Sequence, residues 1–167
     1  FVQDALTYVP QPIRYKIVAN IPYYITSPLL RHFLASPDIG RPELIVFLIQ
    51  KEVAERICDQ KKPMLISWEI KIFGEPEILL TVPPSSFFPS PKVESCVFRI
   101  RVHKAPLISK EEIPTFFKLL EIAYKQPRKT LLNNLLASGR FQKEEILLKF
   151  KRAGIEPNLR PHQLYFQ

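Results

Sequence analysis

Two short apolar runs in the first third of the chain are typical of β-strands that are buried on both faces. The first covers residues 15–19 and ends at Asn20, and the second covers residues 44–49 and ends at Gln50. Nearly continuous apolar runs of this length occur in parallel sheets whose two faces are both covered. The pattern therefore predicts two buried, parallel strands.

Helical patterns follow each of these runs. Residues 27–34 have Ser27 as the expected N-cap and Pro28 in the first turn, where its missing N–H costs nothing. Residues 51–58 carry apolar side chains at helical spacing. Strand, helix, strand, helix with short connections indicates an α/β layer with a parallel sheet.

Two further strands are predicted at residues 77–82 and 92–102, the second with alternating polar and apolar side chains. The connection between them, residues 83–91, is too short for a crossover helix, so the two strands should be antiparallel neighbours. The sheet is thus expected to be mixed and to end in an antiparallel pair.

The period of the apolar residues becomes helical from Ser109 onward. Ser109 and Glu112 form a capping-box pattern, and an amphipathic stretch follows them. Further helices are expected at 128–136 and at 142–153, the latter stopped by Gly154. The chain therefore divides into an α/β part, residues 1–104, and a small all-α part, residues 105–167.

Charge favours a polyanionic partner. The 167 residues carry a net charge of +8. Residues 105–167 hold 11 basic and 6 acidic side chains, a net of +5, against a net of +3 for residues 1–104. The all-α part is the more basic one, as expected for a region that contacts nucleic acid.

Several classes of protein do not fit the composition. Cys58 and Cys96 lie in unrelated contexts, so we expect two free thiols rather than a disulfide framework. No metal site is expected, because the three histidines share no ligand spacing with each other or with the cysteines. No Gly-rich nucleotide loop can be built from the four isolated glycines, Gly40, Gly74, Gly139 and Gly154.

Membrane insertion is not expected either. The longest apolar run, residues 77–84, is broken by Pro83 and is far shorter than the roughly 20 residues that a bilayer span needs. The chain also starts without a secretory signal. We therefore expect a cytoplasmic protein.

The most informative segment follows the first predicted strand. The Asn20 amide can accept a hydrogen bond from an exocyclic amine, and the carbonyl of Ile21, restrained by Pro22, can accept a second. Tyr23 offers a ring for stacking, and ligands of open α/β sheets bind at this end of the strands. These groups fit a planar base with an NH₂ group. They fit equally a strand-ending turn whose aromatics pack on a neighbouring helix.

The segment Asn20–Tyr23 resembles the NLPY-type motif of the ribosomal RNA adenine N6,N6-dimethyltransferases. Four more segments resemble motifs of that family in the same order: residues 3–6 (QDAL), 50–56 (QKEVAER), 87–95 (FFPSPKVES) and 126–135 (QPRKTLLNNL). Pro127 departs from the family, which often has a basic residue at that position.

The resemblance implies a Rossmann-like methyltransferase sheet that is incomplete in this chain. The family's Gly-rich cofactor loop and acidic ribose ligand would precede Phe1, so only the C-terminal half of the sheet is expected, ending in the antiparallel pair. The apolar side of the 15–19 strand would then be exposed. A non-catalytic RNA-binding or assembly fragment is one alternative that follows.

The resemblance also implies roles for individual residues. The cofactor would be S-adenosylmethionine, with Asp4 accepting from its adenine amino group and Asn20 beside it, although Asp4 also suits a simple turn. Asn20 and the Ile21 carbonyl would hold the target adenine N6, Tyr23 would stack on the flipped base, and Phe87 would support it. Phe87 also fits a core aromatic beside two prolines.

Basic residues would bind the RNA in this scheme: Lys92, Lys125, Arg128 and Lys129. The last three also fit a solvated helix face. The implied activity is dimethylation of two adjacent adenines near the 3′ end of 16S ribosomal RNA in the small ribosomal subunit. A relative that methylates large-subunit RNA and confers antibiotic resistance is a further alternative.

Overall fold

The computed structural model describes residues 3–10, 14–36 and 39–165. The packing divides the chain into two compact units. The first unit consists of Phe1–Cys58 with Glu69–Leu107, and the second of Asp59–Trp68 with Ile108–Gln167.

These units do not coincide with the expected parts, because residues 59–68 group with the C-terminal helices. A functional division at residue 104 remains a prediction.

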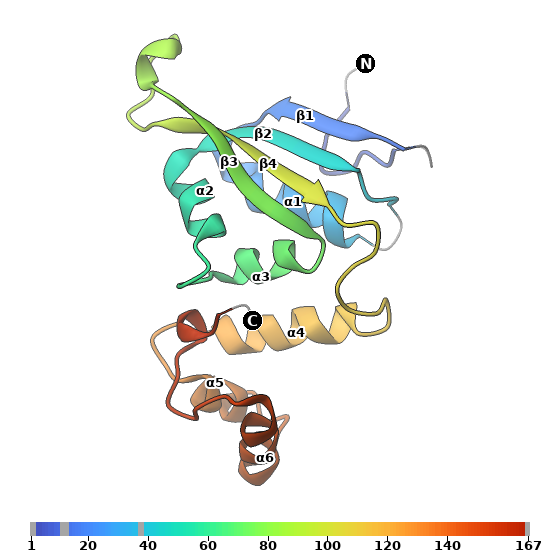
Figure 1. Cartoon of the computed structure of the whole chain (residues 1–167), viewed down its shortest axis with the longest axis vertical. Helices are drawn as coiled ribbons and strands as arrows, with labels where there is room; N and C mark the ends of the chain where they lie inside the picture. Colours follow the sequence, from blue (N-terminus) through green and yellow to red (C-terminus); the bar gives the residue numbers. More distant parts are fainter. Residues whose placement is uncertain (1–2, 11–13, 37–38, 166–167) are drawn as a thin grey trace. The chain divides into compact units, whose positions relative to one another are not determined.

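The first unit is built on a four-stranded sheet in the order β1-β2-β4-β3 (Figure 1). Strands β1 and β2 are parallel, whereas β4 is antiparallel to both of its neighbours. The predicted mixed sheet with a closing antiparallel pair is therefore confirmed. The strands are β1 (Lys16–Asn20), β2 (Leu44–Gln50), β3 (Gly74–Val82) and β4 (Ser95–Val102).

The core of this unit lies on one face of the sheet. Three side chains of β2 pair across the strands with three of β4, and all six are fully buried: Ile45, Phe47, Ile49, Cys96, Phe98 and Ile100. On the opposite face the register places Val46 beside Arg99, which bonds Glu77 at 2.7 Å. The expectation that β2 is buried on both faces is wrong, because charged neighbours keep its second face partly open.

Strand β1 lies at an edge of the sheet. Its Val18 is 76% exposed, in line with the expectation that the apolar side of this strand is uncovered. The expectation that β1 is buried on both faces is therefore wrong, because one of its faces is exposed and β2 is its only neighbouring strand among the described residues.

Three helices belong wholly or partly to the first unit. Helix α1 (Thr26–Ala35) starts one residue earlier than expected, after a 3-10 turn η1 (Tyr23–Ile25). Ser27 is therefore not its N-cap. Helix α2 (Lys51–Cys58) occupies the predicted range. Helix α3 (Leu65–Lys71) was not expected, and it begins in the second unit and ends in the first.

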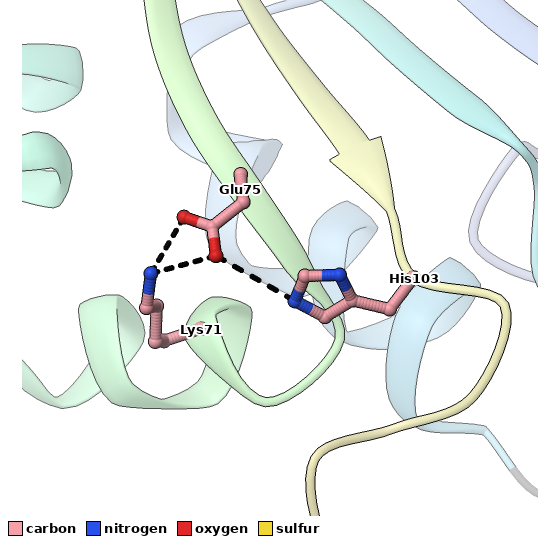
Figure 2. Close-up of polar contacts among 3 residues, drawn as sticks. All are labelled: Lys71, Glu75 and His103. Atoms are coloured by element: carbon pink, nitrogen blue, oxygen red, sulfur yellow. Dashed lines mark hydrogen bonds and ion pairs between the residues drawn. The ribbon is translucent and has the colours of Figure 1, made fainter.

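Polar contacts join the end of α3 to the sheet. Figure 2 shows Glu75 of β3 between Lys71 and His103, with the Lys71 amine at 2.7 and 2.6 Å from its two oxygens. The His103 Nε2 atom lies 3.7 Å from the same carboxylate. This group lies where β3 begins and β4 has just ended, so it belongs to the framework at the end of the sheet away from Asn20.

The second unit contains α4 (Ile113–Tyr124), α5 (Leu131–Ala137) and α6 (Lys143–Ala153). Their shared core consists of Ala123, Leu131, Leu135, Ile146 and Phe150. The Ser109–Glu112 capping box forms, with reciprocal bonds of 3.0 and 3.3 Å, just before α4. Gly154 ends α6 in the left-handed conformation, at φ 65°, as predicted.

The Tyr124 hydroxyl ties the ends of this unit together. It lies within hydrogen-bonding distance of the carbonyls of Pro63 and Pro161 and accepts a bond from the Trp68 indole at 2.8 Å. Burial raises the pKa of Tyr124 to about 12, so the phenol stays protonated and can donate.

The described part of the chain contains neither a candidate membrane-spanning helix nor a candidate metal-binding cluster. None of its helices combines the length and apolarity needed to cross a bilayer. Residues 3–10, 14–36 and 39–165 contain no cluster of three or more His, Cys, Asp or Glu side chains suited to a metal ion.

Candidate functional site

Asn20 is the last residue of β1, and its side chain is exposed. The next residue, Ile21, is buried at 6% exposure and anchors the chain below the surface. Pro22 follows at φ −57° and leads directly into η1. Within the described residues the Asn20 amide has no hydrogen-bond partner, so it is free to bind a ligand.

The turn after Asn20 is held at both ends. The Ile25 amide donates to the Pro22 carbonyl at 3.1 Å, and the Thr26 hydroxyl donates to the Tyr23 carbonyl at 3.0 Å. Thr26 is itself buried at 4% exposure. The backbone of Asn20–Tyr23 therefore has a defined shape before any ligand binds.

A hydrogen bond fixes the Tyr23 ring to a distant part of the chain. Its hydroxyl lies 2.7 Å from the Ser95 Oγ, across 72 positions of sequence. Ser95 is fully buried and begins β4, where it pairs with Gln50 at the end of β2. Two of the family-like motifs, Asn20–Tyr23 and residues 87–95, thus meet at one hydrogen bond that sequence reasoning missed.

The loop between β3 and β4 carries Phe87 and Lys92. It contains the 3-10 turn η2 (Pro84–Ser86) and projects beyond the sheet where β3 stops (Figure 1). Phe87 is half-buried, and its amide donates to the Pro84 carbonyl at 3.1 Å. Lys92 is exposed. The loop leaves both side chains near its surface, and their roles as base support and phosphate ligand remain predictions.

The aromatic residues that directly follow Tyr23 and Phe87 in the sequence are more exposed than Tyr23 and Phe87 themselves. Phe88 is fully exposed and Tyr24 is 84% exposed. In each of these consecutive pairs the other ring, Tyr23 or Phe87, is half-buried. Exposed aromatic rings are surfaces on which bases can stack.

The end of the loop is attached to Lys51, the first residue of α2. Lys51 donates to Glu94 from its amine at 2.9 Å and from its backbone amide at 3.0 Å, the latter to the Glu94 carbonyl. The hydrogen bond to Glu94 raises the pKa of the Lys51 amine. These contacts hold the residues just before Ser95, and hence the partner of Tyr23, in register with β2.

Asp4 lies in an exposed turn rather than at the end of a strand. One carboxylate oxygen accepts from the Leu6 amide at 2.9 Å, and the Asp4 carbonyl accepts from the Thr7 amide at 3.1 Å. Within the described ranges, no hydrogen bond is made by the second carboxylate oxygen. The alternative of a simple turn residue therefore describes its local geometry, and its contact with a cofactor remains a prediction.

The second unit presents the other predicted basic residues. Lys125 is the C-cap of α4, and Arg128 and Lys129 lie on the exposed turn that follows. The helix expected from residue 128 begins only at Leu131, because Thr130 caps it by accepting from the Asn133 amide at 3.2 Å. Arg128 and Lys129 are therefore turn residues, and a solvated helix face is the wrong description of them.

The first unit offers hydrogen-bond acceptors beside an aromatic ring, and each unit separately presents exposed cations. Asn20 and the Ile21 carbonyl are neutral acceptors next to a tethered phenol, which suits a neutral amine rather than an anion. For S-adenosylmethionine the fit is partial. Asp4 has a carboxylate oxygen that makes no hydrogen bond to the residues that the structure describes, but the isolated glycines of this chain make no Gly-rich loop.

Comparison with known proteins agrees with the motifs. A sequence profile described as "Ribosomal RNA adenine dimethylase" matches residues 2–161. "Ribosomal RNA small subunit methyltransferase A" of Dehalococcoides mccartyi is 39% identical over 155 residues, covering 92% of this chain and 53% of that protein. The protein of the same name from Staphylococcus haemolyticus is 38% identical, covering 96% and 56%. The chain spans about half the length of the curated relatives it matches.

Solved structures share the fold. The crystal structure of the 23S rRNA methyltransferase ErmE superposes with a TM-score of 0.71 at 25% identity, covering 96% of this chain and 66% of that one. A dimethyladenosine transferase from Plasmodium falciparum superposes with a TM-score of 0.75 at 23% identity, covering 99% and 67%. The sheet is therefore of the Rossmann-like rRNA methyltransferase class.

Proposed function

Because this chain belongs to the ribosomal RNA adenine dimethylase family, we propose that it forms the base-recognition and RNA-binding part of a small-subunit rRNA dimethyltransferase. The proposed reaction dimethylates N6 of two adjacent adenines near the 3′ end of 16S ribosomal RNA. Such a reaction would take place in the bacterial cytoplasm, where ribosomes are assembled.

Sequence identity supports the small subunit over the large one. Relatives named for the small subunit are 38–39% identical to this chain, whereas ErmE, named for 23S rRNA, is 25% identical. The large-subunit alternative is therefore not favoured.

The observation that carries the proposal is the free Asn20 amide on a rigid turn. The Asn20 oxygen and the Ile21 carbonyl would accept the two N6 protons of a flipped adenine. An exocyclic amine is a poor nucleophile because its lone pair is delocalised into the ring. Hydrogen bonds to both protons turn that lone pair toward the methyl donor, and Tyr23, tethered by Ser95, would stack on the base.

S-adenosylmethionine would supply a methyl group on a positively charged sulfur: the N6–C bond would form as the C–S bond breaks, and the sulfur would keep the electron pair. The proton on N6 then leaves to water, so no strong base is required. Asp4 and Asn20 are the residues of this chain proposed to contact the donor. Their contribution is alignment, which accounts for most of the acceleration in such a transfer.

The exposed cations would bind the RNA. We assign phosphate contacts to Lys92 in the first unit and to Lys125, Arg128 and Lys129 in the second, all of which are exposed. Phosphate contacts position the RNA and make its affinity depend on salt. Phe87 would restore part of the stacking that the flipped base loses.

The test is transfer of labelled methyl groups to under-methylated small ribosomal subunits. A longer protein that carries the upstream residues of the family is compared with the 167-residue chain, each as wild type, Asn20→Ala and the exposed control Asn158→Ala. We expect transfer by the longer protein, abolished by Asn20→Ala with nearly unchanged RNA affinity, and normal in Asn158→Ala. Normal transfer by Asn20→Ala would refute the assigned base site. If the longer protein binds RNA tightly but neither transfers methyl groups nor binds S-adenosylmethionine, the non-catalytic alternative would be favoured.

A further inference from the structure

We infer that Asn134 is a positioning residue that fixes the basic turn, residues 126–130, in the shape that presents Arg128 and Lys129 to RNA phosphates. The inference rests on the proposed function, since it assumes that these two cations bind RNA. Asn134 itself is buried, at 4% exposure.

One side chain closes the turn from inside. The Asn134 oxygen accepts from the Gln126 amide at 2.9 Å. Its NH₂ group donates to the Gln126 carbonyl and to the Thr130 carbonyl, both at 3.1 Å. The first and last residues of the turn are therefore joined through a single amide.

Only asparagine meets these demands at this position. An aspartate lacks the two donors, a leucine lacks donors and acceptor, and a glutamine is one methylene too long for the same place. The neighbouring Asn133 makes a useful contrast, because it is exposed and its side chain makes no hydrogen bond to the residues that the structure describes, while its backbone amide donates to the Thr130 hydroxyl. Chemistry and burial, rather than residue type alone, separate the two asparagines.

The bonds act on the segment that carries the charges. The Lys129 amide donates to the Gln126 carbonyl at 2.9 Å, the same oxygen that Asn134 bonds. Between the two fixed ends, Pro127, Arg128 and Lys129 are all exposed. A turn that is ordered before binding loses less entropy on contact with RNA than a mobile one.

The first experiment measures affinity of the 167-residue chain for a 3′-terminal 16S ribosomal RNA hairpin over a range of salt. The single variants are Asn134→Ala and the control Asn133→Ala. The double variant Arg128→Ala/Lys129→Ala removes both cations, and a triple variant adds Asn134→Ala to it. We expect Asn134→Ala to weaken binding about threefold to tenfold and Asn133→Ala less than twofold. Removing both cations should lower the salt slope by about one to two.

Measuring Asn134→Ala in the Arg128→Ala/Lys129→Ala background distinguishes a positioning role from a general destabilisation of the fold. Without Arg128 and Lys129, Asn134→Ala should cause no further loss, because it acts through them. An equal loss in both backgrounds, or no loss in either, would overturn the inference. If the wild type binds no RNA, or the cation variant binds as the wild type does, the proposed RNA contact falls instead.

Hydrogen exchange then decides the role of Asn134 independently of RNA. In Asn134→Ala the Lys129 amide should exchange at least about tenfold faster, while the amides of α6 keep their protection. Unchanged exchange at Lys129 would show that the turn does not depend on Asn134, and the inference would be wrong.

Discussion

The hydrogen bond between Tyr23 and Ser95 should respond unequally to removal of its two hydroxyls. Ser95 is fully buried, and among the described residues its hydroxyl bonds only Tyr23, at 2.7 Å. Tyr23→Phe therefore strands a buried polar group, which costs about 1–3 kcal/mol of unfolding free energy. Ser95→Ala leaves the half-buried Tyr23 hydroxyl able to reach water, so we expect a loss of at most about 1 kcal/mol.

The double variant gives the coupling energy between the two hydroxyls, which tests the reasoning more strictly than either single variant. With both hydroxyls absent no polar group is stranded, so Tyr23→Phe/Ser95→Ala should be about as stable as Ser95→Ala alone. The resulting coupling energy is about 1 kcal/mol or more. Tyr24→Phe is the matched control, because Tyr24 is 84% exposed and removal of its hydroxyl should change stability by less than about 0.5 kcal/mol.

Urea unfolding of the 167-residue chain, followed by far-UV circular dichroism, measures these values. Equal losses for Tyr23→Phe and Ser95→Ala, or losses that add in the double variant, would refute the reasoning. The same single and double variants can be made in the longer protein and their methyl-transfer rates compared. Adding Ser95→Ala to Tyr23→Phe should not change the rate further.

Two further predictions concern the framework. A Cβ at Gly74 would lie 2.7 Å from the Arg101 carbonyl oxygen, so Gly74→Ala should displace β3 from β4 and cost about 1–3 kcal/mol, measured by the same urea unfolding. Burial raises the pKa of Cys58 to about 11 from 9.0, so its thiolate at pH 8 is about 100-fold scarcer than that of an ordinary cysteine. Iodoacetamide labelling read by mass spectrometry should be correspondingly slow until the chain is unfolded, and rapid labelling of the native chain would contradict this.

Much of the sheet could be predicted because its strands are specified locally. The apolar residues of β2 and the alternation in β4 identify each strand within fewer than ten residues, and the short β3–β4 connection sets their direction. The burial of β2 could not be predicted in the same way. Whether its second face is covered depends on Arg99 and Glu77, which reach it only through the sheet register.

Helix α3 shows where local reasoning fails. Its Glu69 is buried at 3% exposure and forms a two-pronged ion pair with Arg31, 38 positions earlier, at 2.8 and 2.7 Å. A glutamate in a short helix looks like a surface residue in the sequence. Only the fold supplies the guanidinium that makes its burial tolerable.

The sequence also does not reveal which residues of the family-like motifs are buried. Binding roles for Asn20, Arg128 and Lys129 could be proposed from the motifs, and the structure leaves all three residues exposed. Ser95 and Asn134 also lie in family-like motifs, residues 87–95 and 126–135, but nothing in the sequence shows that they point inward.

Burial therefore divides each motif into residues that meet a partner and residues that shape the loop. The Tyr23 ring and the turn before Asn134 are each held by a neutral polar side chain in a regular element, Ser95 in β4 and Asn134 in α5. A neutral group can be buried at small cost when all its bonds are made, and it then fixes backbone that would otherwise be mobile. Substitution of the outward residues should accordingly change binding or transfer at constant stability. Substitution of Ser95 or Asn134 should change both together, and its effect on binding should vanish once the outward residue is gone.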